Sequence, residues 1–234
     1  MNTVKGIIFD YGGTIDTNGV HWAEVIWEQY KLAGVDIEKQ LFREAYVHGE
    51  RTLAKHPIIE PNDTFHTLLI KKIAIHASYL NDKMNTTQES SIAEGCYKKV
   101  LHTLKTTRNV VERLSQHYPM VLVTNFYGNM NIVLKEFSLE DFFSTIIESS
   151  LVGIRKPDPA LFALGTNALN LNPDEILVVG DSYKKDIYPA STLGCRTAWL
   201  KGLCWEEEIP APNAEPDAII KSLEELPYLL QDNY

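Results

Sequence analysis

Short apolar segments that recur along the chain are the feature that most constrains its fold. Each is a few residues long and is apolar on both faces. They occupy residues 4–9, 120–124, 145–148, 176–180 and 197–200. A strand without a polar face is buried on both sides, as in a parallel sheet between two layers of helices.

Stretches with helical periodicity lie between the later apolar segments. We expect helices at residues 129–137, 159–169 and 186–193. Strands that alternate with helices predict an α/β fold with a parallel sheet covered by helices.

The region between the first and second apolar segments breaks this alternation. About 100 residues without a strand-like run separate two elements that a short connection usually joins. Helical periodicity is found at residues 22–32, 37–54, 63–80 and 89–117, the last being long enough for two helices. We therefore predict a core of residues 1–16 and 106–234 and a helical insert of residues 17–105. The insert should lie above the carboxyl end of the first strand, where open α/β sheets bind ligands.

The charge of the chain argues against nucleic acid as a partner. Its 234 residues include 22 Lys and Arg against 31 Asp and Glu, a formal net charge of -9. The longest basic runs are pairs of lysines, so no basic stripe offsets the repulsion of a polyanion.

The cysteines and the N-terminal segment indicate the compartment. Cys96, Cys195 and Cys204 lack the spacing of a disulfide framework or a zinc site. The first apolar segment is too short for a signal peptide or a membrane span. We expect reduced thiols in a cytoplasmic protein that does not bind membranes. The sequence does not indicate an oligomeric state.

Carboxylates follow two of the apolar segments. Asp10 comes directly after the first and precedes Gly12 and Gly13, in a turn whose backbone N–H groups a phosphate can approach. Asp181 and Asp186 follow the fourth segment, where two acids at a strand-to-helix turn can hold a hard cation.

Hydrogen-bond donors and a lysine follow the other segments. Thr124 and Asn125 end the second segment and offer donors to phosphoryl oxygens, and Lys156 can reach both an anion and Asp10. Taken singly, these residues have simpler roles as helix caps, turns or solvated loop residues. Their joint occurrence at the ends of separate predicted strands favours one site.

Four sequence motifs, in order along the chain, resemble those of the haloacid dehalogenase-like hydrolase superfamily. They are IIFDYGGTID at residues 7–16, VLVTN at 121–125, KPDPALF at 156–162 and VVGDSYKKDI at 178–187. The resemblance covers nearly the whole chain. It implies a Rossmann-like three-layer core with a parallel sheet, and the helical insert looks like the family's C1 cap.

The resemblance also implies a mechanism for a small phosphorylated substrate. Asp10 would be the nucleophile that accepts a phosphoryl group, while Asp10, the Gly12 carbonyl and Asp181 would hold Mg²⁺ with the help of Asp186. The phosphoryl oxygens would be bound by Gly13, Thr124, Asn125 and Lys156, and Lys156 would also steady Asp10.

Gly12 departs from the family's phosphatase pattern, which has a second Asp at this position. That Asp protonates the leaving oxygen and activates water, roles worth about 10² to 10⁴ in rate. A substrate with a good leaving group needs little protonation, so turnover can be slow or restricted to such substrates. Alternatively, the chain has lost turnover and binds a phosphorylated ligand.

Another residue can also replace the missing acid. Asp16 belongs to the same segment, but we expect its side chain to point elsewhere. Candidates in the cap are His21, His48 and Arg51, of which the last two are three residues apart and share a helix face. We include His48 and Arg51 among the predicted substrate-binding residues.

Dehalogenases of the superfamily also lack the second Asp, so displacement of halide from carbon is the competing prediction. They need no Mg²⁺, and their fourth motif does not require paired acids. Because Asp181 and Asp186 are both present here, we rank phosphoryl transfer first.

The remaining predictions concern packing and the C-terminal region. Trp22, Trp27 and Tyr30 have helical spacing and are expected to pack rather than stack on a ligand. We expect a solvated loop at Trp205 and residues 206–208. Residues 216–220 resemble the family's closing edge segment, and a terminal helix is predicted at 222–230.

Overall fold

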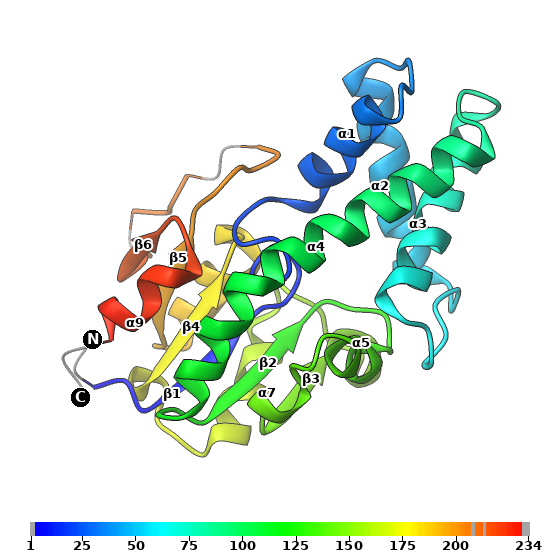
Figure 1. Cartoon of the computed structure of the whole chain (residues 1–234). Helices are drawn as coiled ribbons and strands as arrows, with labels where there is room; N and C mark the ends of the chain where they lie inside the picture. Colours follow the sequence, from blue (N-terminus) through cyan, green and yellow to red (C-terminus); the bar gives the residue numbers. More distant parts are fainter. Residues whose placement is uncertain (1–2, 207–208, 213, 231–234) are drawn as a thin grey trace.

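A six-stranded parallel sheet forms the centre of the molecule (Figure 1). The computed structural model describes residues 3–206, 209–212 and 214–230. The strands are β1 (Gly6–Phe9), β2 (Met120–Thr124), β3 (Thr145–Glu148), β4 (Ile176–Gly180), β5 (Arg196–Leu200) and β6 (Ala218–Ile220). Their order is β3-β2-β1-β4-β5-β6, and each neighbouring pair is parallel. The predicted α/β fold is confirmed, and β6 lies in the predicted edge segment.

Side chains that alternate along the strands fill two apolar layers. Ile8 and Val178 face one side of the sheet, where they pack with Phe162 of α7 (Pro159–Leu169). Ile7 and Val179 face the other side, in the cluster that includes residues of the long helix α4 (Thr86–Ser115). The core is therefore a three-layer structure of helices, sheet and helices.

Shorter helices complete the two outer layers and the connections. They are α5 (Met130–Glu136), α6 (Ser149–Val152), α8 (Tyr188–Thr192), α9 (Leu226–Leu229), the 3-10 turns η1 (Glu140–Phe142), η2 (Pro173–Glu175) and η4 (Leu223–Glu225), and the π-turn η3 (Tyr183–Ile187). The terminal helix predicted at 222–230 is thus a 3-10 turn followed by one turn of α-helix. Ser222 caps this short unit, and its start is held by a hydrogen bond of 2.9 Å from Leu223 N to Asn18 Oδ1.

Three cap helices stand beyond the carboxyl edge of the sheet (Figure 1). They are α1 (Trp22–Leu32), α2 (Lys39–Lys55) and α3 (Phe65–Leu80). Thr64 begins α3, because its side chain accepts a hydrogen bond from Thr67 N. α2 packs on α3, and both α1 and α3 pack on α4.

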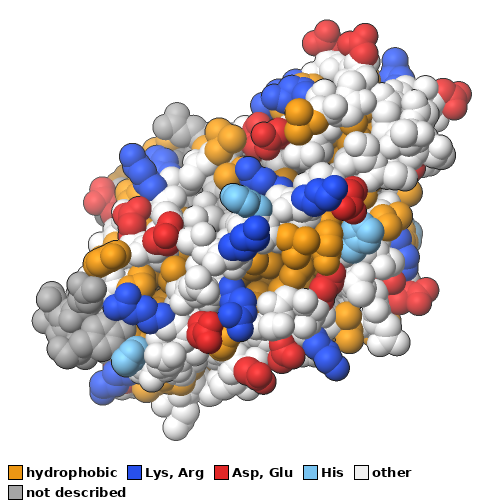
Figure 2. All heavy atoms as spheres, viewed as in Figure 1, with side chains coloured by type: hydrophobic (Ala, Val, Ile, Leu, Met, Phe, Trp, Pro, Cys, Tyr) orange, Lys and Arg blue, Asp and Glu red, His pale blue; other side chains and the backbone are white. Residues whose placement is uncertain are grey.

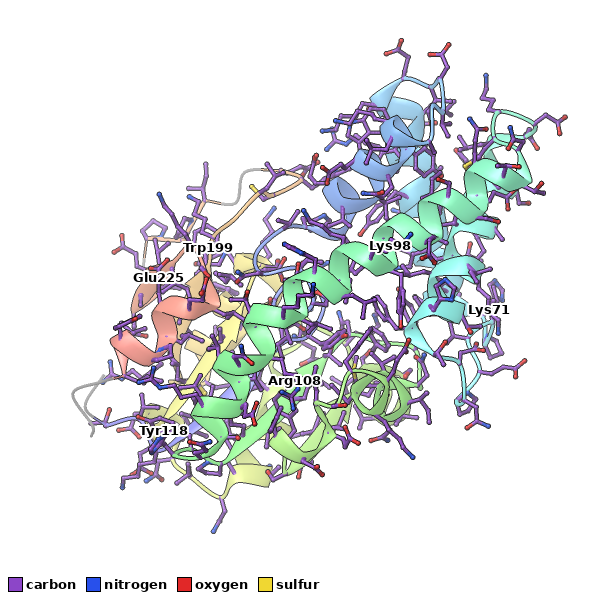
Figure 3. The ribbon with its side chains drawn as sticks, viewed as in Figure 1. Lys71, Lys98, Arg108, Tyr118, Trp199 and Glu225 are labelled. Carbon is purple, nitrogen blue, oxygen red and sulfur yellow. The ribbon has the colours of Figure 1, made fainter. Side chains whose placement is uncertain are left out.

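A single helix, α4, connects the cap to the core. It begins three residues before the predicted start, at a capping box of Asn85 and Gln88, and continues unbroken to Ser115. Lys98 lies on the half of α4 beside the cap helices, whereas Arg108 lies on the half that covers the sheet (Figure 3). The predicted boundary at residue 105 therefore falls inside a continuous helix.

The loop after β5 is largely solvated, as the sequence suggested, but Trp205 contacts the cap. Trp205 is half-buried, with its ring 5.6 Å from that of Tyr46 and 4.5 Å from the Arg43 guanidinium carbon. Glu206 forms an ion pair with Arg43 at 2.8 Å. The expectation of a solvated residue is wrong for Trp205, because α2 supplies both an aromatic surface and a cation, and it is confirmed for Glu206, whose side chain is 69% exposed. Glu207 and Glu208 lie outside the described residues.

The surface charges are mixed (Figure 2), and the three cysteines are not joined in disulfides. Charged side chains of both signs are interspersed on the face shown in Figure 2. Cys96, Cys195 and Cys204 are free, and the first two are buried. Among the described residues, no helix combines the length and apolarity needed to cross a membrane.

Candidate active site

Three carboxylates converge at the carboxyl edge of the sheet. Asp10 directly follows β1, and Asp181 and Asp186 follow β4, the neighbour of β1. Phe9 pairs with Val179, so the two strands end side by side. One oxygen atom of each acid lies within 4.8 Å of the others. The structure thus brings the three predicted metal-binding acids together.

The turn after Asp10 is shaped by a glycine and a threonine. Gly13 has a φ of +91°, which side chains rarely adopt, and a Cβ there would overlap the carboxylate of Asp181. The Thr14 hydroxyl donates to Asp10 Oδ2 at 3.3 Å and accepts from Asp181 N at 3.1 Å. Thr14 therefore joins the two acidic segments. The Gly13 amide donates to Asp16 Oδ1 at 2.7 Å, which does not support its predicted contact with substrate.

Lys156 is buried between two of the acids. Its Nζ lies 2.6 Å from Asp10 Oδ1 and 2.7 Å from Asp186 Oδ1, with 2% of its side chain exposed. Burial alone would lower the pKa of Lys156, but the two carboxylates raise it above its ordinary value. Lys156 is therefore a fixed positive charge that orients Asp10.

Asn125 positions this lysine rather than pointing freely into the site. Its Oδ1 accepts from Lys156 N at 2.9 Å, and its Nδ2 donates to Lys156 O at 3.2 Å. Thr124 is 1% exposed, and both residues line the cavity beside Asp10. Of the predicted phosphoryl ligands, Thr124 and Lys156 are the better placed to contact a substrate.

Asp186 is directed inward by the π-turn η3. A Cβ at Gly180 would overlap the Asp186 side chain, so this glycine allows the acid to fold back against the strand. Ser182 N donates to Asp186 Oδ2 at 3.1 Å. A π-turn is rare and is frequently found at functional sites.

The charges of the site favour a hard cation. Burial raises the pKa of Asp10 to about 6, partly opposed by Lys156 and increased by Asp186. Burial and the charges of Asp186 and Asp10 raise the pKa of Asp181 well above its ordinary value. Three crowded carboxylates with one lysine between them form an oxygen donor set that suits Mg²⁺.

The position of Gly12 offers no carboxylate. A Cβ there would lie 3.9 Å from both Cδ1 and Nε1 of Trp22, which covers this part of the turn. The Trp22 indole donates from Nε1 to Asp16 Oδ2 at 2.8 Å. Trp22 thus packs, as expected, and also lines the cavity.

Other candidates for the missing acid are occupied, neutral or distant. Both oxygens of buried Asp16 accept hydrogen bonds, one from the Gly13 amide and one from the Trp22 indole. The Asp16 side chain is therefore occupied by these two groups. Burial and the nearby charge of Lys185 lower the pKa of His21 to about 4. His21 lines the cavity, but its Nδ1 accepts from Ala23 N at 3.2 Å, so its neutral Nε2–H can donate hydrogen bonds and is a very weak acid.

His48 and Arg51 do share a helix face, but the structure does not bring them to the cavity. They are exposed and line a separate hollow on the outside of α2, together with Tyr79 and Trp205. The physical reason is the rotation of α2, whose residues Phe42, Ala45, Gly49 and Leu53 are the ones buried. Their position does not support the prediction that they bind substrate.

A cavity of about 230 Å³ lies between the acids and the cap. On the cap side, its walls are largely apolar, with Trp22, Phe65, Leu68 and Leu69. Glu50 and Lys72, which the sequence analysis did not single out, also face this cavity and form an ion pair at 2.7 Å.

Fold and site together define a parallel α/β core with a helical insert and a cluster of three acids at the carboxyl edge of the sheet. The model of the haloacid dehalogenase-like hydrolases matches residues 4–194, and the chain belongs to this family. It is a hydrolase, and the resemblance inferred from the four motifs is confirmed.

Relatives of the chain include both phosphatases and a dehalogenase. The glyceraldehyde 3-phosphate phosphatase of Pyrococcus furiosus is 40% identical over 63 residues, 27% of this chain and 26% of that relative. This match therefore spans only about a quarter of the phosphatase's length. The (S)-2-haloacid dehalogenase 2 of Pseudomonas sp. (strain CBS-3) is 24% identical over 98% of this chain and 97% of its own.

A solved structure of the family shares the fold. The HAD-hydrolase of Bacillus subtilis, crystallised bound to magnesium, covers 97% of this chain and 98% of its own with a TM-score of 0.58 and 16% identity. At this identity the likeness describes the fold alone.

Proposed function

We propose that the chain is a Mg²⁺-dependent phosphatase that acts on a small phosphorylated metabolite through an aspartyl-phosphate at Asp10. The observation that carries the proposal is Lys156 held between Asp10 and Asp186, with Asp181 completing the acidic cluster. Asp10 and Asp186 share the positive charge of Lys156, which offsets part of their negative charge.

The residues of the chain divide the work of phosphoryl transfer. Lys156 binds Asp10 Oδ1 and keeps the carboxylate oriented, so that Oδ2 attacks phosphorus in line with the leaving oxygen. Thr124 and Lys156 donate to the equatorial oxygens, and Asn125 holds the Lys156 loop in place. Asp10, Asp181 and the Gly12 carbonyl would bind Mg²⁺, with Asp186 orienting the site, and Mg²⁺ held there would supply positive charge next to the phosphoryl group.

The absence of a carboxylate at Gly12 limits the substrates. Two side chains of the cavity that could supply a proton to an alkoxide are poorly suited to it, because His21 is neutral and burial raises the pKa of Tyr46 well above its ordinary value. An acyl or aryl phosphate needs no such proton, because its leaving oxygen carries the negative charge itself. The later attack of water on the aspartyl-phosphate should be the slow step.

The proposal is tested by pre-steady-state kinetics with Mg²⁺ and either acetyl phosphate or 4-nitrophenyl phosphate. We expect a burst of product equal to the enzyme concentration, followed by slower turnover and trapping of phosphate on Asp10. Steady turnover that Asp10→Asn leaves unchanged would refute the mechanism. Tight phosphate binding without turnover of any phosphorylated compound would instead indicate a binding protein.

A 2-haloacid dehalogenase is the second candidate, favoured by the end-to-end similarity to the Pseudomonas enzyme. In that reaction Asp10 would attack carbon, and halide would leave without a metal. An assay of (S)-2-chloropropionate with EDTA present separates the two classes. Halide release under these conditions would reverse our ranking, whereas its absence together with a burst of the leaving group from a phosphorylated substrate supports the phosphatase.

A further inference from the structure

The Lys72–Glu50 pair is a polar group set into the apolar cap side of the cavity. Lys72 lies on α3 and Glu50 on α2, and the lysine Nζ is 2.7 Å from Glu50 Oε1. The Lys72 side chain is 7% exposed, with its Nζ 5.9 Å from the Trp22 ring and 5.5 Å from the Tyr127 ring. The Glu50 side chain is 35% exposed, so of the two side chains the lysine is the one largely withdrawn from solvent. A desolvated ion pair adds little stability over apolar packing, so stability alone does not account for its place in this wall.

Tyr127 ties the pair to the core. Its hydroxyl donates to Glu50 Oε2 at 3.0 Å, and Tyr127 comes from the loop that follows β2, two residues after Asn125. The pair therefore has a fixed position relative to the phosphoryl site. An ammonium group has three N–H donors, and Glu50 and Tyr127 account for at most two of them, which leaves one for a ligand.

The charges of the pair select the kind of ligand. Lys72 stays protonated, because the carboxylate of Glu50 raises its pKa despite burial, and Lys72 lowers the pKa of Glu50. The lysine is therefore a cation rather than a nucleophile, and Glu50 neutralises it. A second anionic group on the substrate would meet no net positive charge here. A hydroxyl group fits the pair better, because it accepts from an ammonium and donates to a carboxylate at once.

From this arrangement we propose that Lys72 and Glu50 are specificity residues that bind a hydroxyl group on the phosphorylated substrate, at the end remote from Asp10. The inference rests on the proposed phosphatase function and narrows it, among substrates with good leaving groups, to short phosphates that carry a hydroxyl group. A cavity of about 230 Å³ is below the range of about 300 to 1,000 Å³ common for drug-sized ligands, which agrees with a short substrate.

The test compares the binding of phosphonates that no phosphatase step can cleave. The probes are 2-hydroxyethylphosphonate and 3-hydroxypropylphosphonate, their methyl counterparts propylphosphonate and butylphosphonate, and the anionic phosphonoacetate. Isothermal titration calorimetry with Mg²⁺ gives the dissociation constant of each. We expect one hydroxyl compound to bind wild type on the order of tenfold more tightly than its methyl counterpart, since hydrogen bonds to charged groups have about this value.

Variants assign the preference to the pair. Lys72→Met should remove the preference and leave binding of the methyl counterpart within about threefold, since the phosphoryl site is separate. The double variant Lys72→Met/Glu50→Gln removes both charges and leaves no unpaired buried acid, so it covers the case in which the single variant does not fold. The matched control is Lys71→Met: Lys71 is the neighbouring lysine on α3, bound to Asp63 at 2.6 Å and to the Ile58 carbonyl (Figure 3). It should keep the preference.

Each outcome decides between the two levels of inference. Equal binding of hydroxyl and methyl compounds by wild type overturns the hydroxyl site and leaves the phosphatase proposal standing. The same holds if phosphonoacetate binds best and loses that advantage in Lys72→Met, which would assign a carboxylate to the pair. If none of the phosphonates binds in Mg²⁺, the phosphoryl site itself fails, and the specificity proposal fails with it.

Discussion

The two walls of the cavity differ in how they are built. The core wall consists of polar side chains at the ends of strands, such as Asp10, Thr124 and Asp181, which come from short motifs; Thr14 joins the first and last of these motifs. The cap wall consists of aromatic and aliphatic side chains with one ion pair, Lys72–Glu50, whose members come from different helices. The chemistry of the site is therefore a local property of short motifs, whereas the shape that selects a substrate depends on helix packing.

This contrast predicts that changes in the core wall alter the reaction and that changes in the cap wall alter the choice of substrate. Asp10→Asn should have the largest effect, a loss on the order of 10⁴-fold or more in kcat, because it removes the nucleophile. Steady-state turnover of 4-nitrophenyl phosphate measures it. An unchanged Tm would show that the variant is folded. Substantial turnover by the folded variant would show that the core wall does not supply the nucleophile through Asp10.

Removal of the Lys156 charge should weaken the fold as well as the reaction. Lys156→Met leaves Asp10 and Asp186 buried together without a cation, and we expect a loss of about 3–5 kcal/mol in the free energy of unfolding. Urea denaturation without Mg²⁺ measures this loss. Lys5→Met is the control, since Lys5 pairs with Glu175 at 2.6 Å at an exposed site and should have little effect. Equal stability of the two variants would contradict the prediction that the charge of buried Lys156 contributes more to stability than the charge of exposed Lys5.

Gly12→Asp adds a carboxylate to the core wall and leaves the cap wall unchanged, so it should alter the reaction. A carboxylate at this position can protonate a leaving alkoxide and activate water, so turnover of alkyl phosphates should rise about 10²-fold. Gly12→Ala adds the Cβ without the acid, and a Cβ makes only an ordinary contact with Trp22 at 3.9 Å. A gain in both variants would show that packing against Trp22, rather than proton transfer, had changed the rate.

Binding of Mg²⁺ should depend on pH more than an ordinary aspartate would allow. The pKa of Asp10 is raised to about 6 without metal, and only the ionised carboxyl binds the cation. Affinity should therefore fall as pH decreases through 6, by roughly tenfold between pH 7 and pH 5. Calorimetry in two buffers of different ionisation enthalpy detects both the affinity and the proton released. Constant affinity over this range would mean that Lys156 keeps Asp10 ionised.

Much of the core was predictable because its signals are local. Short apolar runs identified the strands, with β2, β3 and β4 at the predicted residues. The acids at the ends of β1 and β4 had to meet once those strands were neighbours. The hydrogen bonds of Gly13 and Asn125 to their own chain were not predictable, because the same amide and side-chain groups could serve a ligand or the backbone.

The cap wall was harder to predict because its contacts join distant segments. Lys72 gave a signal that was not used: it falls on the stripe of Phe65, Leu68 and Leu69, where helical spacing favours an apolar residue. A lysine on a buried stripe needs a partner. That partner, Glu50, lies on another helix, and no short-range pattern pairs the two. Trp205 was missed for the same reason, since its neighbours on α2 are far away in sequence.

The unbroken path of α4 from cap to core has a consequence for the design of chimeras. With about 1.5 Å of rise and 100° of rotation per residue, one residue inserted near position 105 would turn the attached cap by about 100° about the helix axis. Lys72 and Glu50 would then no longer stand above Asp10. A cap taken from a relative must therefore be joined in helical phase, and two added turns, about seven residues, would restore the angle while lifting the cap by about 10 Å.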